Sequence, residues 1–171
     1  MNKNLITPEY LRAAFFVRED GVLCHAVKTH GFAGVRNPGD PAGCVNNNGH
    51  LVVATCGVRM LAHKVVWVLC YNAYPPTGFD IDHKDRNKQN NHPDNLRLAT
   101  RSQNNYNATK RKRNTSGYKG VSFDKARGKW DARLNADSKT YRLGRFDTAE
   151  LAAAAYNEAA RQLHGDFARL N

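Results

Sequence analysis

The chain has 171 residues, and its 26 lysines and arginines against 15 aspartates and glutamates give a net charge of +11. This length suits one large domain or two small ones. No run of about 18 apolar residues is present, which excludes a membrane span. The amino terminus lacks the apolar core and small-residue cleavage site of a secretory signal. We therefore expect a protein that is not secreted and stays in the cytoplasm or nucleoid of its host cell.

The positive charge is concentrated in one segment. Residues 101–145 hold 13 basic and 3 acidic residues, a net charge of +10, so the rest of the chain is close to neutral. A charge gathered in one place indicates a polyanionic partner. An anionic membrane is the rival, but aromatic and β-branched residues alternate with the charges here and form no basic amphipathic helix. Nucleic acid is therefore favoured.

The four cysteines, Cys24, Cys44, Cys56 and Cys70, form no CxxC pair. Cys56 and Cys70 stand among aliphatic residues, as small buried hydrophobic side chains do. A disulfide framework is not expected in an intracellular chain of this size. A zinc site built from all four stays as an alternative, although the paired spacing of ligands is missing.

The first half of the chain changes pattern twice. Residues 1–57 are rich in Gly, Asn and Pro and predict turns and short strands, with one strand at 51–56. Residues 61–74 have helical length and no helix breaker before Pro75 and Pro76, which predicts a helix. An asparagine-rich loop follows at 83–95.

Residues 79–82 and 95–99 alternate apolar and polar positions and predict two antiparallel strands around that loop. Thr100 and Gln103 then fit a capping box, so a helix is expected to start there. A β-hairpin followed by a helix can bring Asp82, His83 and Asn104 together around one ion. The motif is therefore a candidate active site.

These residue types suit phosphodiester hydrolysis, which needs a hard cation for the phosphate and a base for water. Mg²⁺ takes oxygen ligands and needs only one or two protein groups. Imidazole is a base suited to neutral pH. Asp85 is a further carboxylate, but two residues beyond His83 it is expected to point away. Taken singly, an Asp-His pair or an asparagine cluster is most often a turn; the joint spacing favours the site.

Residues 108–116, with Lys110, Arg111, Lys112 and Arg113, hold no apolar residue larger than alanine. We expect a basic linker and the domain boundary there.

Beyond the linker, short strands are expected at 118–123, 129–134 and 140–146, with Trp130 and Leu134 on the apolar face of the second. A helix follows, with Asp147 as N-cap and Glu150 completing the cap. Its apolar face is expected to hold Leu151, Ala155, Ala159 and Leu163, and Gly165 should end it. Strands with one helix make an α+β module.

Residues 79–105, FDIDHKDRNKQNNHPDNLRLATRSQNN, resemble the HNH (ββα-metal) endonucleases of the phage and homing type. The resemblance implies His83 as general base, Asp82 and Asn104 as metal ligands, and Asn95 as the residue that braces the loop and orients His83. It also implies Mg²⁺, for which Mn²⁺ can substitute. The nuclease domain would span residues 1–107, with its core at about 79–107. The roles of His63, Asn90, Asn91 and His92 stay open.

Residues 117–171 are similar to the Apetala/ethylene-response-factor DNA-binding domain, through YKGVSF, GKWDARL, YRLGRF and the closing ARLN. That resemblance implies a three-stranded sheet in the major groove of DNA, with the helix behind it. Ser122, Asp131 and Arg133 depart from the plant pattern, so no target sequence is implied. The expected DNA contacts are Lys119, Ser122, Lys125, Arg127, Lys129, Arg133 and Arg142, together with Lys110, Arg111, Lys112 and Arg113 of the linker.

The sequence therefore predicts an α+β protein: short N-terminal strands, a ββα-metal module, and a three-stranded sheet packed on one helix. The expected function is divalent-metal-dependent cleavage of double-stranded DNA by a monomer or weak dimer, encoded by a phage or mobile element. The alternative is a DNA-binding transcriptional regulator whose nuclease site is silent. An RNA-directed nuclease is a third possibility.

Overall fold

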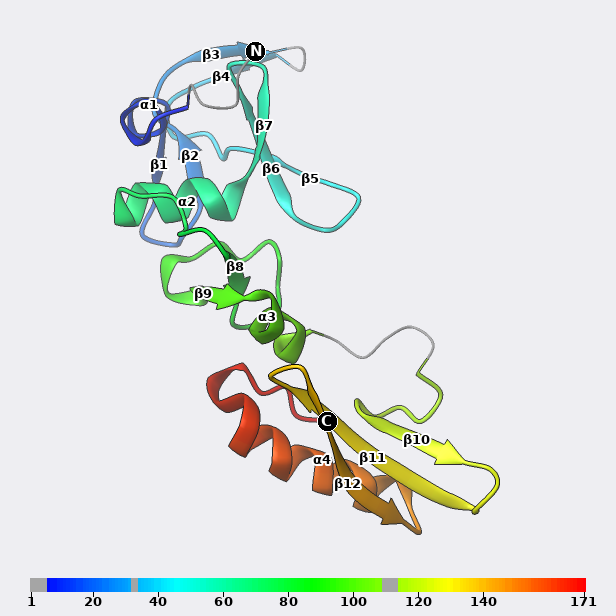
Figure 1. The fold of residues 1–171 in the computed structure, drawn as a ribbon. Coiled ribbons are helices and arrows are strands. Elements are labelled where there is room, and N and C mark those ends of the chain that lie inside the picture. The colour runs from blue at the N-terminus through cyan, green and yellow to red at the C-terminus, as the bar shows by residue number, and fades with distance from the viewer. Residues whose placement is uncertain (1–5, 32–33, 109–113) are drawn as a thin grey trace. The chain divides into compact units, whose positions relative to one another are not determined.

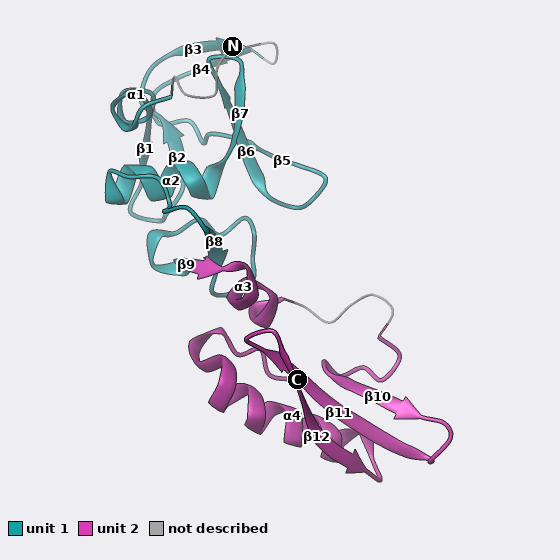
Figure 2. Cartoon of the chain, viewed as in Figure 1, with its two compact units in different colours: residues 1–98 teal, residues 99–171 magenta. Residues whose placement is uncertain are grey.

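A computed structural model describes residues 6–31, 34–108 and 114–171 of the chain. The chain divides into two compact units, residues 1–98 and 99–171 (Figure 2). The division falls earlier than the expected boundary at 108–116. The reason is that Tyr106, which lies in the helix at Arg101–Asn107, packs in the core of the C-terminal unit, so this helix belongs to the second unit. Residues 109–113 of the expected linker lie outside the described part, so the linker stays a prediction.

The N-terminal unit consists of small antiparallel sheets and two helices (Figure 1). β1 pairs with β2, β3 with β4, and β5, β6 and β7 form a three-stranded sheet. The strand at 51–56 is confirmed as β6. The elements before the hairpin are α1 (Pro8–Ala14), β1 (Phe15–Val17), β2 (Leu23–His25), β3 (Thr29–Gly31), β4 (Gly34–Arg36), β5 (Cys44–Val45), β6 (Leu51–Thr55), β7 (Val58–Leu61) and α2 (Ala62–Tyr71).

Helix α2 is the centre of this unit's core. Its Val65, Val66 and Val68 are completely buried, and it contacts α1, β1, β6 and β7. The helix ends at Asn72, which adopts a left-handed conformation with φ of 54°. The prediction for the cysteines was wrong, since Cys56 and Cys70 are exposed and Cys24 is buried. Helix α1, capped by the Thr7 side chain, was not predicted.

The predicted hairpin and helix are confirmed at 79–107. Strands β8 (Phe79–His83) and β9 (Leu96–Thr100) pair in a two-stranded sheet, with the 3-10 turn η2 (Pro93–Asn95) before β9. Helix α3 (Arg101–Asn107) begins with the predicted capping box, in which Thr100 and Gln103 exchange both hydrogen bonds. Ile81 and Leu96 anchor the hairpin in the core of the N-terminal unit.

The C-terminal unit contains a three-stranded antiparallel sheet in the order β10-β11-β12, with a helix packed against it. Its core gathers Leu134, Tyr156 and Ala160 around Tyr106 of α3, whose ring stacks on His164 with centroids 3.8 Å apart. The elements are β10 (Val121–Asp124), β11 (Lys129–Ala136), β12 (Lys139–Phe146), α4 (Ala149–His164) and η3 (Gly165–Phe167).

Two details of the long helix α4 differ from the sequence prediction. Its N-cap is Thr148, whose side chain accepts a hydrogen bond from the Leu151 amide; Asp147 instead pairs with Lys129. The predicted apolar face was also wrong, because Leu151 and Leu163 are exposed. The buried face comprises Ala149, Ala152, Ala153, Tyr156, Ala160 and His164. Small alanines meet the sheet here because they let helix and strands approach closely.

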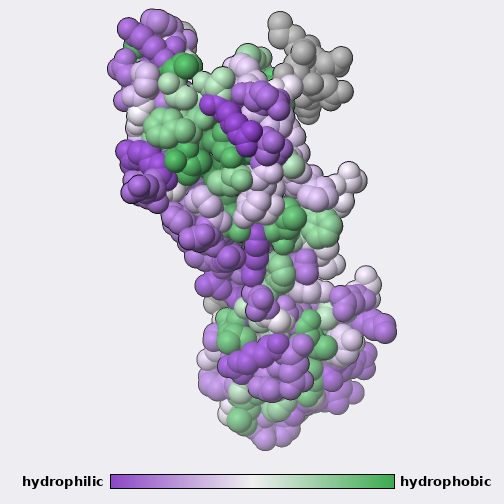
Figure 3. Space-filling model, turned by 90° about the vertical axis from the view of Figure 1, so that its left-hand side faces the viewer, coloured by the Kyte–Doolittle hydropathy of each residue, from purple (hydrophilic) through white to green (hydrophobic). Residues whose placement is uncertain are grey.

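On the face drawn in Figure 3, hydrophilic residues cover most of each unit, with smaller areas of apolar residues between them. Among the described residues, none of the helices combines the length and apolar character needed to cross a lipid bilayer.

Candidate functional site

Strand β8 ends in Asp82 and His83, which are both buried, with 7% and 5% of their surface exposed. The Asp82 carboxylate pairs with Arg97 of the neighbouring strand, whose Nε and Nη2 lie 2.9 and 2.8 Å from Oδ2. A buried charge is stable in a protein only when it is paired. Arg97 therefore compensates the charge of Asp82 and fixes its position at the end of β8.

The imidazole of His83 is held by a second buried polar residue, Asn91. Nε2 of His83 lies 3.0 Å from Oδ1 of Asn91. An amide oxygen accepts a hydrogen bond, so this contact favours the tautomer that carries its proton on Nε2 and its lone pair on Nδ1. The lone pair is what a general base or a metal ligand needs. Asn91, whose role the sequence left open, thus selects the tautomer of His83.

Asn95 braces the loop that carries these groups. Its Nδ2 donates to Oδ1 of Asp85 and to the carbonyl of Asn90, at 2.9 and 2.7 Å, and its Oδ1 accepts from the amide of Asp85. Its carbonyl also accepts from the amide of Lys84, next to His83. Through this last bond Asn95 reaches the backbone next to His83.

Asp85 belongs to this brace. Its carboxylate accepts from the amide of Asn87 and from the side chains of Asn90 and Asn95. Partial burial raises the pKa of Asp85, but these hydrogen bonds outweigh it and hold the pKa below its usual value. Sequence reasoning left Asp85 out of the candidate set because, two residues beyond His83, it was expected to point away from the strand end.

Gly21 packs closely against His92 of the same loop. A Cβ on this residue would lie 2.6 Å from Cα and 2.7 Å from Cβ of His92, and its φ is +80°. Only glycine allows the turn between β1 and β2 to approach the loop this closely.

Three imidazoles, His50, His63 and His83, lie together, with one ring nitrogen from each within 4.8 Å of the others. Burial lowers the pKa of His63 to about 3, and the neighbouring His83 and His50 add to the effect. Burial, followed by Lys88 and His83, also lowers the pKa of His50. These three residues are called the histidine cluster below. Sequence reasoning missed His50, since nothing in its local pattern marks it.

The two residues predicted to hold the metal offer oxygen donors, the type that a hard cation prefers. Asp82 offers a carboxylate, and the predicted second ligand, Asn104, lies half-buried on α3 and offers an amide oxygen. The chemistry of these oxygens suits Mg²⁺ or Mn²⁺ rather than a soft ion. Asn104 belongs to the second compact unit, so a shared ion on Asp82 and Asn104 stays a prediction.

The C-terminal sheet presents a cluster of arginines around one carboxylate. Asp131 of β11 pairs with Arg133 and, at 3.2 Å, with Arg145 of β12. The hydrogen bond from Arg133, more than offsetting burial, keeps the pKa of Asp131 below its usual value. Arg142 is exposed beside them, and the four residues line one shallow hollow. A fixed carboxylate between guanidinium groups limits how they can orient.

The sequence missed Arg145 because of a β-bulge. Arg133 pairs with Arg142, but the next residue back, Ala132, pairs with Gly144, so β12 holds one extra residue there. The extra residue reverses the alternation beyond it and brings Arg145 to the face of Arg142. Gly144 has a φ of +130°, which suits glycine at this irregularity.

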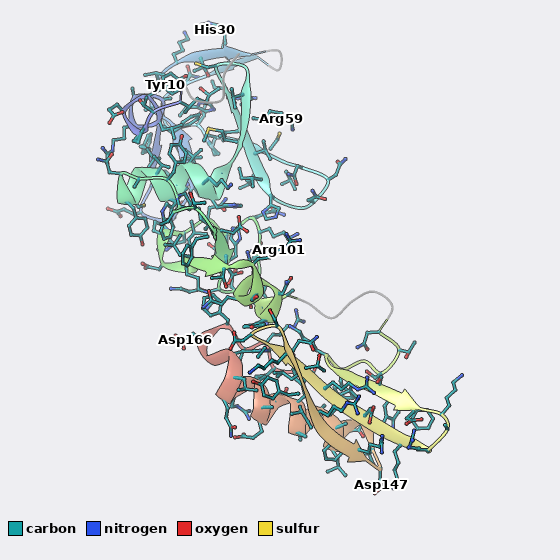
Figure 4. All side chains as sticks on the ribbon, viewed as in Figure 1. Tyr10, His30, Arg59, Arg101, Asp147 and Asp166 are labelled. Carbon is teal, nitrogen blue, oxygen red and sulfur yellow. The ribbon has the colours of Figure 1, made fainter. Side chains whose placement is uncertain are left out.

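The remaining predicted DNA contacts fall into four groups. Lys119 donates to the carbonyls of Asn105, Tyr106 and Ala108 at the end of α3, so its ammonium is engaged within the unit. Lys129 pairs with Asp147, which is labelled in Figure 4, and Arg127 pairs with Asp124. Ser122 and Lys125 are exposed. Lys110, Arg111, Lys112 and Arg113 lie outside the described residues. As DNA contacts, all of these stay predictions.

Comparison with known proteins agrees with both resemblances. The family model described as HNH endonuclease matches residues 60–106, and the one described as AP2 domain matches residues 116–166. "Protein 3.8" of Escherichia phage T7 is 41% identical over 107 residues, 63% of this chain and 87% of that protein. An uncharacterized HNH endonuclease of Acanthamoeba polyphaga mimivirus is 34% identical over 113 residues, covering 66% of this chain and 58% of that protein.

The plant relatives match a third of this chain or less. The dehydration-responsive element-binding protein 2E of Oryza sativa subsp. japonica is 50% identical over 56 residues, 32% of this chain and 17% of that protein. No solved structure matched the chain significantly. The geometry at 79–107 and these matches lead to one conclusion: the chain belongs to the HNH endonuclease family and carries a C-terminal AP2 domain.

Proposed function

We propose that this protein is a divalent-metal-dependent endonuclease that hydrolyses phosphodiester bonds of double-stranded DNA. The observation that carries the proposal is the pair at the end of β8. There, a paired carboxylate, Asp82, stands next to an imidazole, His83, whose tautomer Asn91 selects. A DNA-binding domain in the same chain supplies the substrate class.

In the proposed reaction Nδ1 of His83 takes a proton from a water in line with the scissile phosphorus. The water oxygen bonds to phosphorus as the bond to the 3′-oxygen breaks, which leaves a 5′-phosphate and, after protonation by solvent, a 3′-hydroxyl. A hard cation held by Asp82 and Asn104 would neutralise the charge of the phosphate and of the departing oxygen. Asn91 keeps the proton on Nε2 and so keeps Nδ1 available.

For DNA binding we propose that the sheet of the AP2 domain enters the major groove. Arginine can contact a guanine edge with two hydrogen bonds, worth about 1–3 kcal/mol of discrimination each. Arg133, Arg142 and Arg145 stand on one face of that sheet. The basic segment 110–113 would follow the phosphate backbone.

A homing-type enzyme encoded by a phage or mobile element fits the phage and mimivirus relatives. With one site per chain, a monomer acting in the cytoplasm or nucleoid would nick DNA. A double-strand break would need a second chain or a second visit.

Relaxation of supercoiled plasmid tests the proposal. In Mg²⁺ or Mn²⁺ the wild type should convert supercoiled to open-circular DNA, whereas His83→Ala should not. If both are equally inert on DNA that contains a demonstrated binding site, the alternative of a transcriptional regulator with a silent site is correct. Competition between duplex DNA and RNA in a binding assay tests the third possibility, an RNA-directed nuclease. A preference for RNA would contradict binding in the major groove of DNA.

A further inference from the structure

The histidine cluster brings together side chains from three separate elements of the N-terminal unit. His50 precedes β6, His63 lies in the first turn of α2, and His83 ends β8. His63 and His83 are buried and His50 is half-buried. Three imidazoles without a carboxylate or thiolate among them form a neutral nitrogen donor set, unlike the oxygen donors proposed for Mg²⁺.

The spacing of the rings suits one tetrahedral ion. The ring centroids of His50 and His63, His50 and His83, and His63 and His83 lie 5.3, 5.9 and 5.0 Å apart. An ion bound at the zinc–nitrogen distance lies about 3.2 Å from each centroid, so tetrahedral angles separate the centroids by about 5.2 Å. The rings are inclined to one another at 62°, 45° and 85°. The ligating nitrogens, which lie within 4.8 Å of one another, would close to about 3.3 Å around a bound ion.

The protonation states point to the same donor set. Nδ1 of His50 is buried and has no hydrogen-bond partner in the described part of the chain. A buried polar atom left in this way is costly unless something else binds it. His83 holds its lone pair on Nδ1 because Asn91 fixes the proton on Nε2.

We propose that His50, His63 and His83 form a binding site for a transition-metal ion such as Zn²⁺ or Co²⁺, and that the bound ion inhibits the nuclease. Nitrogen ligands prefer these ions strongly over Mg²⁺. Ligation uses the same Nδ1 lone pair of His83 that would accept the proton from water, so the ion and the base reaction exclude each other. The inhibition, unlike the binding, rests on the proposed nuclease function.

Co²⁺ is the probe for binding, because its visible absorption reports four-coordinate ligation directly. The full chain, stripped with EDTA, should bind one Co²⁺ with the intense absorption of a tetrahedral site, and Zn²⁺ should displace it. Loss of a second-shell partner typically weakens a metal site about 10–100-fold, so loss of a ligand should weaken it at least about 100-fold. His50→Gln and His63→Gln should each show that loss.

His30→Gln is the matched control, since His30 (labelled in Figure 4) is an exposed histidine of β3 in the same unit. It should bind Co²⁺ as the wild type does. Circular dichroism establishes that each variant is folded. Unchanged Co²⁺ affinity in both folded cluster variants, or an absorption typical of six-coordinate Co²⁺, overturns the site.

Inhibition is measured as the ratio of nicking rates in Mg²⁺ with and without one equivalent of Zn²⁺. The wild type should lose most of its rate, while His50→Gln should give a ratio near one. A wild type that binds Zn²⁺ at the cluster and nicks at an undiminished rate overturns the inhibitory role. If the wild type does not nick DNA at all, the nuclease proposal fails, and the Co²⁺ spectra still decide the metal site.

Discussion

Oδ1 of Asn91 lies 3.0 Å from Nε2 of His83, so one buried amide determines which nitrogen of the proposed base carries the proton. Removing that amide should free the ring to take the other tautomer. We expect Asn91→Leu to slow nicking about 10–100-fold, as for other residues that orient a reactive histidine.

The conservative variant Asn91→Asp keeps an acceptor at this position and should retain more activity than Asn91→Leu. Asn47→Ala, at an exposed asparagine of the same unit, is the control and should nick at the wild-type rate. Single-turnover nicking of supercoiled plasmid measures all three. Equal rates for Asn91→Leu and Asn47→Ala would remove Asn91 from the site.

The ion pair of Asp82 and Arg97 should contribute strongly to stability, because their side chains are only 8% and 16% exposed. Arg97→Leu leaves a buried carboxylate unpaired, and the expected loss in the free energy of unfolding is about 3–5 kcal/mol. The double variant Asp82→Asn/Arg97→Leu should recover part of this lost free energy of unfolding, because it removes the unpaired buried charge. Urea unfolding in EDTA measures these values.

The exposed pair of Arg18 and Asp20 is the comparison, with side chains 44% and 54% exposed. Arg18→Leu should cost less than about 1 kcal/mol. An Arg97→Leu variant no less stable than Arg18→Leu would show that the buried pair is not held as described.

Gly21 should tolerate no side chain, because a Cβ there would meet the backbone of His92. We expect Gly21→Ala to destabilise the protein by about 1–3 kcal/mol through overpacking and to slow nicking by displacing the 83–95 loop. Gly39→Ala is the control that separates steric contact from backbone strain. The two glycines have similar φ angles, +80° at Gly21 and +92° at Gly39, but no atom lies within 4 Å of a Cβ at Gly39. Thermal unfolding should show a larger fall in the melting temperature for Gly21→Ala than for Gly39→Ala. Equal falls would mean that backbone strain alone is responsible.

The pH dependence of stability in the C-terminal unit should depend on Tyr156. Burial raises the pKa of its phenol from 10.0 to about 12. The unfolded chain releases this proton near pH 10 and the folded chain retains it, so stability present below pH 10 is lost as the pH rises to 12. The loss is about 3 kcal/mol at most.

Tyr156→Phe has no phenol proton to release, so its free energy of unfolding should not show this loss between pH 10 and 12. Tyr141→Phe, on β12, should keep it. Urea titrations between pH 9 and about 12 compare the three proteins. The same alkaline slope in wild type and Tyr156→Phe would contradict the assignment.

Asp131 should increase the discrimination between DNA sequences at the cost of affinity. Asp131→Ala removes a negative charge from the proposed DNA face and releases Arg133 and Arg145. Non-specific affinity should therefore rise and the preference for a selected site should fall. Asp124→Ala, which releases Arg127 in the turn, is the control. Fluorescence anisotropy at several salt concentrations measures both quantities, and a sharper preference in Asp131→Ala would contradict this role.

The sequence determined the elements whose signals are local. The capping box of Thr100 and Gln103 was predicted, since both residues lie within one helical turn. The hairpin of β8 and β9 followed from alternating apolar residues on either side of a polar loop. The spacing from Asp82 to Asn104 carried the family resemblance, which the family match confirms at residues 60–106.

Only the tertiary structure decided how distant residues meet. The approach of His50 and His63 to His83, the pairing of Asp82 with Arg97, and the contact of Gly21 with His92 join residues that no local pattern connects. The bulge that turns Arg145 outward likewise depends on how β12 pairs with β11. Such contacts arise when separate elements bury a common core, and the packing of that core determines which side chains face one another.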